Sequence, residues 1–248
     1  MRFDINAFFG PWQFWPLRHP DIEDVLRLMD RYGIDRAAIT SLRGMYGERR
    51  EANAETLAAA RAHGDRLTPL AVMSPMCGGG AAELRALVGE GFRAIRLYPL
   101  LHAYRLYDPF ADEVCETAAE LHIPVIVCTR PMMNFRFAAY PIEEVGDLAG
   151  RHPATQFILS GPNYLTEFRA AVIVMQRCPN VAIELTCMQG LESLRRMVEA
   201  VGARRVLFGT GIPLHYPACN VAKLTSAKVS EAVREAVAVG NARRMLGV

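Results

Sequence analysis

Short apolar runs that alternate with helix-like segments constrain the fold of this chain more than any other feature. Runs rich in Val, Ile and Leu are expected to be strands at residues 3–6, 36–40, 67–73, 92–98, 124–128, 155–159, 181–185 and 206–208. Helical patterns lie at residues 21–32, 51–63, 81–88, 109–121, 141–150, 165–177, 191–201, 230–238 and 241–246. Alternation of this kind predicts a parallel sheet, and eight strand–helix units favour an α/β fold of the closed (β/α)8 TIM-barrel type.

The length of the chain suits one such barrel. The sequence has 248 residues, of which 51% are hydrophobic, and a β/α barrel typically takes about 250. No linker-like stretch or run of charge divides it, so residues 1–248 are expected to form a single domain. The alternative is an open doubly wound sheet, which usually carries a glycine-rich dinucleotide loop after its first strand. Here the loop at residues 8–16 is aromatic instead.

Charge and cysteine usage exclude several classes of function. The net charge is +2 with both signs scattered, so no nucleic-acid surface is expected. No apolar run reaches membrane-spanning length, and the N-terminus has no signal-peptide pattern. The six cysteines are widely spaced without a CxxC pair, which is typical of reduced thiols. We therefore expect a cytoplasmic protein without nucleic-acid or membrane partners, and a homodimer is possible.

In a TIM barrel, function lies at the carboxyl ends of the strands. Alternation along the fourth strand directs Arg96 and Tyr98 into the barrel mouth and the apolar residues 95 and 97 towards the helices. Arg96 is expected either to form an internal ion pair with Glu184 or to clamp the carboxylate or phosphate of a substrate. Arg130, after the fifth strand, is a second candidate clamp, or a solvated loop arginine.

Three residues are candidates for catalysis, and none belongs to a metal-binding histidine pair. His215 follows the eighth strand closely and is the best acid–base candidate. Tyr98 is a second candidate for proton transfer. Cys128 is either a nucleophile, whose pKa Arg130 would lower, or a small buried thiol. The remaining candidates for substrate binding lie at strand ends and are Asn6, Asn163, Glu184 and Thr210.

Six segments together resemble the amidohydrolase superfamily, in the amidohydrolase 2 branch that includes aminocarboxymuconate semialdehyde decarboxylase. They are residues 4–10 (DINAFFG), 91–99 (GFRAIRLYP), 123–129 (IPVIVCT), 157–161 (FILSG), 207–213 (LFGTGIP) and 240–247 (GNARRMLG). The resemblance covers nearly the whole chain and implies a metallo-dependent-hydrolase-like TIM barrel.

The same resemblance implies that the metal-ligand positions of the family have been replaced in this chain. Asn6 and Phe8 stand where the family has its two strand-one histidines, and Cys128 and Gly161 where it has those of strands five and six. Gly211 stands at the strand-eight aspartate. A divalent ion would have too few donors to hold an activated water. We therefore expect no metal and no other cofactor.

Three functional interpretations remain open. The first, which we favour, is a metal-independent hydrolase of lactone or amide type that acts on a small carboxylate-bearing molecule. Some lactonases of this superfamily work without metal, and a decarboxylase or lyase is a less favoured reaction. The second is a catalytically inactive member that binds a small molecule. In the third, the aromatic loop at residues 8–15 docks a partner chain, although it would serve equally as a lid. A polar cavity at the mouth would support the first two, and filling by Phe8, Trp12 and Phe14 would exclude them.

Overall fold

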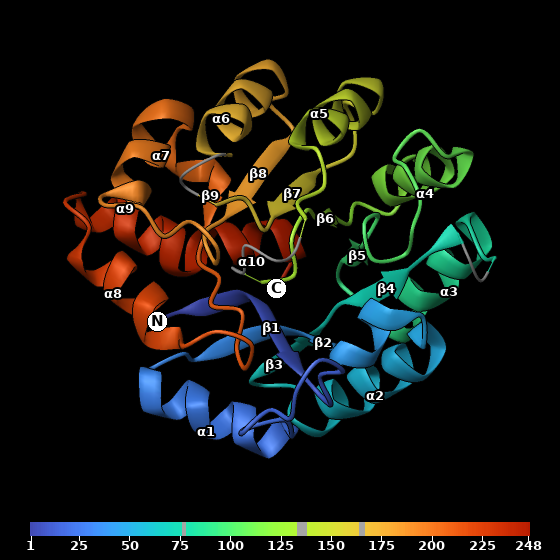
Figure 1. Cartoon of the computed structure of the whole chain (residues 1–248), viewed down its shortest axis with the longest axis horizontal. Helices are drawn as coiled ribbons and strands as arrows, with labels where there is room; N and C mark the ends of the chain where they lie inside the picture. The colour runs from blue at the N-terminus through green and yellow to red at the C-terminus, as the bar shows by residue number, and fades with distance from the viewer. Residues whose placement is uncertain (76–77, 133–137, 164–166) are drawn as a thin grey trace.

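Parallel strands form a ring that helices surround (Figure 1). The computed structural model describes residues 1–75, 78–132, 138–163 and 167–248. The strands are β1 (Phe3–Phe9), β2 (Arg36–Ser41), β3 (Leu67–Pro69), β4 (Ala71–Met73), β5 (Ile95–Leu97), β6 (Val125–Cys128), β7 (Phe157–Ser160), β8 (Val181–Glu184) and β9 (Val206–Leu207).

Hydrogen bonds close this ring into the predicted barrel. The stretch at residues 67–73 connects two parallel sheets, because β3 pairs with β2 while β4 pairs with β5. The pairing then continues in sequence order from β5 to β9. At the seam, the Ile5 N–H donates to the Phe208 carbonyl over 3.0 Å, and the Gly211 N–H donates to the Asn6 carbonyl over 2.7 Å. The TIM-barrel prediction is thereby confirmed. Strands β3 and β4 together take the place of one of the eight barrel strands, which we call staves.

The helices of the outer ring largely follow the sequence pattern. They are α1 (Ile22–Tyr32), α2 (Arg49–Ala62), α3 (Ala81–Glu90), α4 (Pro109–Glu120), α5 (Ile142–Arg151), α6 (Phe168–Arg177), α7 (Ser193–Val201), α8 (Pro217–Ser226), α9 (Glu231–Glu235) and α10 (Asn241–Leu246). Asp108 caps α4, because its carboxylate accepts the Phe110 N–H. The first two residues of the predicted helix 165–177 lie outside the described residues. In the described part of the chain, no helix has the length and apolar character needed to cross a membrane.

Two elements differ from the sequence expectation. Helix α8 was not predicted, since its sequence contains Asn, Thr and Ser, which favour helix poorly. Strand β1 continues three residues beyond the expected end, to Phe9. Its register against β2 shifts between Asp4 and Ala7. This irregularity re-aims the side chains that follow it, so that Phe8 lies inside the barrel mouth and not in a surface loop.

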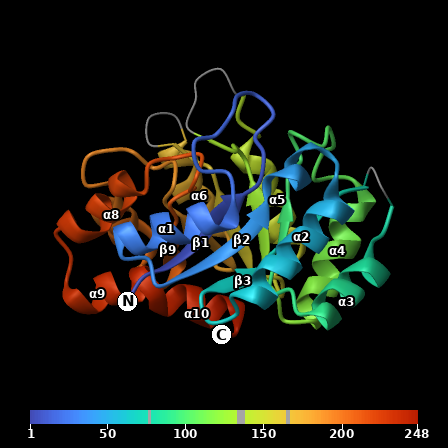
Figure 2. The ribbon, with the colours of Figure 1, turned by 90° about the horizontal axis from the view of Figure 1, so that it is seen from below.

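The barrel interior is filled in layers. At the amino end, one apolar side chain or more from each stave packs against α10, which closes the bottom: Phe3, Ile5, Ala38, Leu70, Ala94, Ile126, Ile158, Ala182 and Leu207. Figure 2 shows α10 and both termini at this end, and the loop after β1 at the opposite end. A second, larger cluster packs the outer faces of the strands against the helices. Ile95 and Leu97 belong to that outer cluster, so alternation directs Arg96 inward.

Candidate functional site

A layer of buried polar side chains lies above the apolar bottom of the barrel, at the carboxyl ends of the strands. Each member is at most 4% exposed: Asp4, Asn6, Thr40, Arg96, Ser160, Glu184, Thr186 and Thr210. Buried polar groups are costly unless they are hydrogen-bonded. The contacts of this layer therefore determine which of its members remain available for chemistry.

The guanidinium of Arg96 forms hydrogen bonds within the barrel itself. Its Nε donates to Thr40 Oγ1 over 3.0 Å, its Nη1 to Asn6 Oδ1 over 2.8 Å and its Nη2 to the Ile5 carbonyl over 3.1 Å. The guanidinium carbon also lies 4.8 Å from the centre of the Phe8 ring. Arg96 is fully buried. These contacts describe a structural arginine that ties together three staves, and they include no ion pair with Glu184 among the described residues.

Glu184 is surrounded by donors from neighbouring strand ends. Its Oε1 accepts the Ser160 hydroxyl over 2.7 Å, the Gly161 N–H over 3.2 Å and the Asn6 amide over 3.4 Å. Its Oε2 accepts the Thr186 N–H over 2.7 Å. A carboxylate with four donors and 1% exposure is held in one orientation. Glu184 therefore organises the ends of β7 and β8.

Asp4 has the same role on the other side of the layer. Its Oδ1 accepts the N–H groups of Asn6 and Thr210, both over 2.9 Å, and its Oδ2 accepts the Thr210 hydroxyl. Burial raises the pKa of Asp4 to about 6, although these hydrogen bonds act in the opposite direction. Asp4 thus joins β1 to the segment after β9.

Two glycines occupy positions where the resemblance implies metal ligands, and neither leaves room for a side chain. A Cβ added to Gly161 would lie 2.5 Å from the Arg130 carbonyl oxygen. A Cβ added to Gly211 would overlap Nδ1 of His215. Both glycines have positive φ, +101° and +72°, which other residues rarely adopt. The imidazole of His215 thus fills the space that a side chain at position 211, after β9, would occupy.

His215 is held in this place by its own loop. Its backbone N–H donates to the Gly211 carbonyl over 3.0 Å, and its side chain is partly exposed. Burial, and then the charge of Lys223, lower the pKa of His215 to about 4. At neutral pH the imidazole is therefore uncharged and able to accept a proton.

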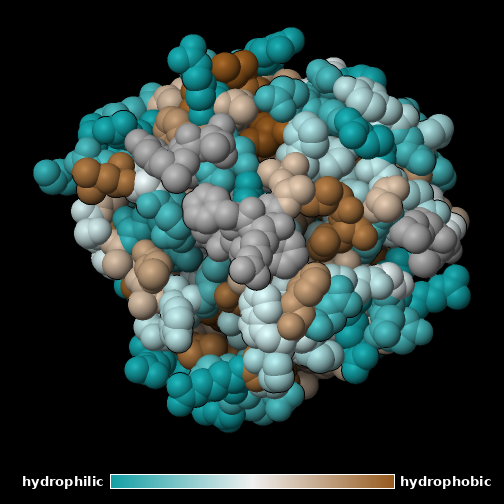
Figure 3. Space-filling model, viewed as in Figure 1, coloured by the Kyte–Doolittle hydropathy of each residue, from teal (hydrophilic) through white to brown (hydrophobic). Residues whose placement is uncertain are grey.

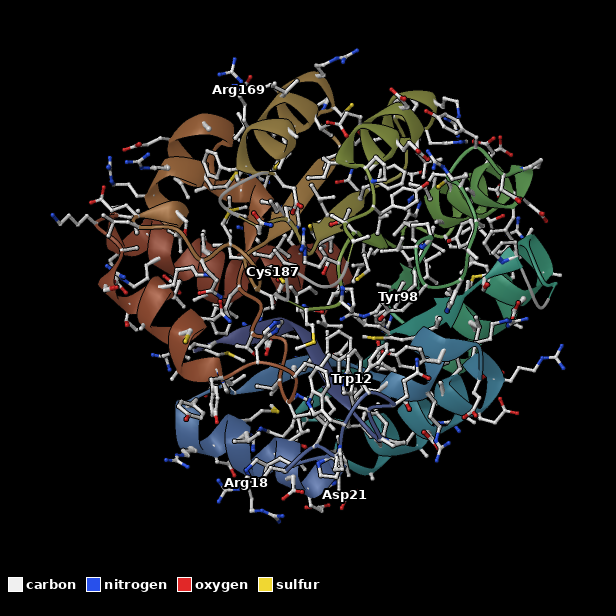
Figure 4. All side chains as sticks on the ribbon, in the orientation of Figure 1. Trp12, Arg18, Asp21, Tyr98, Arg169 and Cys187 are labelled. Atoms are coloured by element: carbon white, nitrogen blue, oxygen red, sulfur yellow. The ribbon has the colours of Figure 1, made fainter. Side chains whose placement is uncertain are left out.

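An apolar cluster covers the polar layer at the mouth. Its buried members are Phe8, Trp12, Leu42, Met45, Val72, Tyr98, Cys128 and Met132. Trp12 and Tyr98 lie near the centre of the ring in Figure 4, together with Cys187. Phe8 and Trp12 are buried, whereas Phe14 is half exposed. The aromatic loop therefore packs into the mouth through part of its length only.

This cluster sets the protonation of the two other catalytic candidates. Burial raises the pKa of Cys128 to about 12, and the nearby Arg96 opposes this only in part. The backbone of Arg130 also lowers the pKa of Cys128, but desolvation is the larger effect, so the net shift is upward and not the lowering expected for a nucleophile. Burial also raises the pKa of Tyr98 above its ordinary value. At neutral pH Cys128 is a thiol, not a thiolate, and Tyr98 is a phenol that can donate a hydrogen bond.

Arg130 is bound within the loops that follow β6 and β7. It is 6% exposed and forms an ion pair with Glu167. The other carboxylate oxygen of Glu167 accepts the Asn163 N–H over 2.7 Å. Arg130 and Asn163 therefore belong to one charged group at the rim, separate from the Arg96 network.

Sequence reasoning gave no role to three residues of the site, although two of them follow strands directly. Ser160 and Thr186 complete the donor set of Glu184, and the charge of Lys223 on α8 acts on His215. Nothing in the sequence distinguishes them, because a lysine in a helix is normally solvated and the hydrogen-bonding partners lie far apart in the chain.

The donor set does not fit the divalent ion that the resemblance implies. Within residues 1–75, 78–132, 138–163 and 167–248, no three His, Cys, Asp or Glu side chains are grouped to hold a metal. The two carboxylates of the polar layer, Asp4 and Glu184, already accept hydrogen bonds at both of their oxygens from protein N–H and O–H groups. Stable coordination would require these hydrogen bonds to break.

The surface around the mouth has no large hydrophobic patch on the face that can be seen among the described residues. On the face shown in Figure 3, hydrophobic residues form separate small patches in a largely hydrophilic surface. The hollows lined by described residues include three at the amino end of the barrel and two between outer helices.

Comparison with known structures returns the same architecture. The 5-carboxyvanillate decarboxylase LigW from Sphingomonas paucimobilis superposes with a TM-score of 0.79 at 15% identity, covering 100% of this chain and 99% of that one. A 2,6-dihydroxybenzoate decarboxylase from Rhizobium gives 0.76 at 17% identity, covering 99% and 98%. The 5-carboxyvanillate decarboxylase from Novosphingobium aromaticivorans, solved with manganese and 4-hydroxy-3-methoxy-5-nitrobenzoic acid, gives 0.78 at 14% identity, covering 100% and 96%. At these identities the likeness establishes the fold alone.

Comparison of the sequence with curated proteins returns no match. A family model described as amidohydrolase, in contrast, matches residues 4–248. This match spans the barrel from the first strand to the closing helix and agrees with the resemblance found in the sequence. The chain therefore belongs to the amidohydrolase family.

Proposed function

We propose that this protein is a metal-independent hydrolase that acts on a small carboxylate-bearing lactone or amide at the barrel mouth. The observation that carries the proposal is the position of His215 over Gly211. According to the resemblance, the family carries an aspartate at this strand end. That aspartate binds metal or acts as a general base. Here a neutral imidazole occupies the corresponding space.

The basicity of His215 is close to that of the aspartate whose place it takes. Its pKa of about 4 is close to that of an ordinary aspartate. The imidazole would take a proton from a water molecule, whose oxygen attacks the carbonyl carbon of the substrate. The C–O or C–N bond then breaks, and the proton passes from the imidazolium to the departing oxygen or nitrogen. These reaction steps need no metal-bound water.

The surroundings favour an aromatic carboxylate as substrate. The aromatic side chains of Phe8, Trp12 and Tyr98 lie packed at the mouth and would have to part to contact a substrate, and Arg130 at the rim would bind the substrate carboxylate in exchange for Glu167. Decarboxylases with the same fold carry 2,6-dihydroxybenzoate or a nitrobenzoic acid in their structures. The protonated phenol of Tyr98 would donate a hydrogen bond to the oxyanion that develops on the carbonyl.

The test is a panel of aromatic lactones and amides, assayed in the presence of a chelator with wild-type protein and His215→Gln. We expect turnover by the wild type whose rate rises with pH through an apparent pKa near 4, and at least about a hundredfold loss in the variant. His19→Gln is the matched control, because His19 lies in another loop of the same face and is exposed. Full activity in His215→Gln, or activity that depends on added metal, would contradict the proposal.

A second candidate function is ligand binding without reaction. The observation in its favour is the saturation of Asp4, Asn6 and Glu184 by hydrogen bonds within the barrel, which leaves the polar layer with little freedom. Aromatic carboxylates would then raise the melting temperature of the wild type and of His215→Gln equally, without any turnover.

A further inference from the structure

The chain contains 26 arginines but only two lysines, Lys223 and Lys228. Both lysines line one cavity of about 580 Å³ between α7 and α8. These two helices are neighbours in the outer ring (Figure 1). A chain that uses arginine for nearly all of its positive charge thus has both of its side-chain amines at one site.

The two amines differ in their surroundings. Lys228 is exposed at the edge of the cavity. Lys223 reaches inward, where its Nζ donates to the Leu185 carbonyl and, over 2.7 Å, to Asn220 Oδ1. Among the described residues, neither lysine forms an ion pair within 4.0 Å of a carboxylate. Lys223 is therefore a partly buried amine held by neutral acceptors.

We propose that Lys223 is a carbonyl-reactive site that forms an imine with small aldehydes or ketones entering this cavity. The Nζ lone pair attacks the carbonyl carbon, a C=N bond forms, and the carbonyl oxygen leaves as water with two protons from the amine. No oxidant or reductant is needed. The inference is independent of the proposed hydrolysis, because the reacting amine belongs to the cavity between α7 and α8.

Burial of Lys223, and not the charges around it, favours the uncharged amine that this reaction requires. Burial lowers its pKa to about 8, while Glu184 on β8, Cys187 after β8 and Cys219 one turn earlier on α8 oppose the shift. His215, before α8, is uncharged at neutral pH. At pH 7 roughly a tenth of such an amine is neutral, compared with less than a thousandth of an ordinary lysine. A guanidinium in the same place would stay protonated and unreactive.

The experiment uses propanal with cyanoborohydride at pH 7, followed by peptide mass spectrometry. Reduction traps the imine as a stable secondary amine, and Lys228 is an internal control that borders the same cavity. We expect Lys223 to be modified about tenfold faster than Lys228, and its rate to reach half of its maximum near pH 8. Equal modification of the two lysines, or modification of Lys228 alone, would overturn the proposal.

A matched pair of variants guards against indirect effects. In Lys223→Arg, which keeps the charge, the fast modification should disappear while Lys228 reacts at its original rate. In Lys228→Arg, the fast modification of Lys223 should persist unchanged. Loss of the fast reaction in Lys228→Arg, with an unaltered thermal melt, would show that Lys228 and not Lys223 reacts fast. That result would refute the inference.

Discussion

The substitution Asp4→Asn tests the balance of forces in the polar layer. The pKa of Asp4 is about 6 in the folded chain, against roughly 3.9 for an unfolded aspartate. The folded state therefore holds the proton more tightly, so the stability that this proton contributes is fully present below about pH 4. It is lost as the pH rises through 6, when a buried carboxylate must form. A shift of about two pH units corresponds to about 3 kcal/mol of unfolding free energy.

Asparagine removes that charge while keeping the shape of the side chain. Its amide oxygen can still accept the N–H groups of Asn6 and Thr210, and the Thr210 hydroxyl can turn to accept from the amide. We expect urea unfolding at pH 4 and at pH 7.5 to show the difference. Relative to wild type, the variant should gain about 2.5 kcal/mol between the two pH values, less than the full shift because an unfolded aspartate is already about half ionised at pH 4. Using the difference cancels the opposite pH dependence of His215, which both proteins share.

Asp65→Asn is the control for this experiment, because Asp65 is exposed and its replacement should leave the pH dependence as it is. The reasoning would be refuted if Asp4→Asn followed the wild-type pH dependence. In that case the hydrogen bonds to Asp4 would compensate its burial completely. A large loss of stability at both pH values would instead indicate that the second carboxylate oxygen is required as an acceptor.

The same contacts lead to three further predictions. Arg96→Met should lower the unfolding free energy by about 3–5 kcal/mol in urea titrations, because three acceptors lose a buried donor; a change within about 0.5 kcal/mol would contradict the structural role. Lys223→Gln should raise the pKa of His215, measured by NMR titration of the imidazole, but only partly, since burial is the larger cause; an unchanged value would exclude the electrostatic link. Elemental analysis of protein purified without chelator should find well below one equivalent of zinc or iron per chain, and a tightly bound equivalent would contradict the donor-set argument.

The barrel could be predicted from the sequence because it depends on local periodicity. Each stave is a short apolar run, and each is followed by a helical pattern, so the order of elements determines the parallel sheet. The inward direction of Arg96 followed in the same way from alternation along β5. Helix α8 escaped prediction because its stability comes from packing against the barrel rather than from its own residues.

The contacts of the site could not be predicted, because they join residues that are far apart in the chain. The Asn6 amide donates to Thr186 Oγ1 over 3.0 Å, across 180 positions of sequence. The sequence left Arg96 either as a partner of Glu184 or as an anion clamp, and the structure gives it a third set of partners instead. For Cys128, the sequence left open a thiol activated by a nearby charge and a small buried thiol, and the structure agrees with the second.

The replaced ligand positions form a coherent alternative to a metal centre. A divalent ion would hold the strand ends together through shared side chains, and in this barrel hydrogen bonds hold them together instead. Asp4 joins β1 to the segment after β9, and Glu184 joins β7 to β8. The glycines are part of this arrangement, because Gly161 admits the Arg130 backbone and Gly211 admits the His215 ring. Restoring a ligand at either glycine would therefore displace a neighbour before it could offer a donor. Restoring the ligands that the resemblance implies would thus require the mouth as a whole to repack.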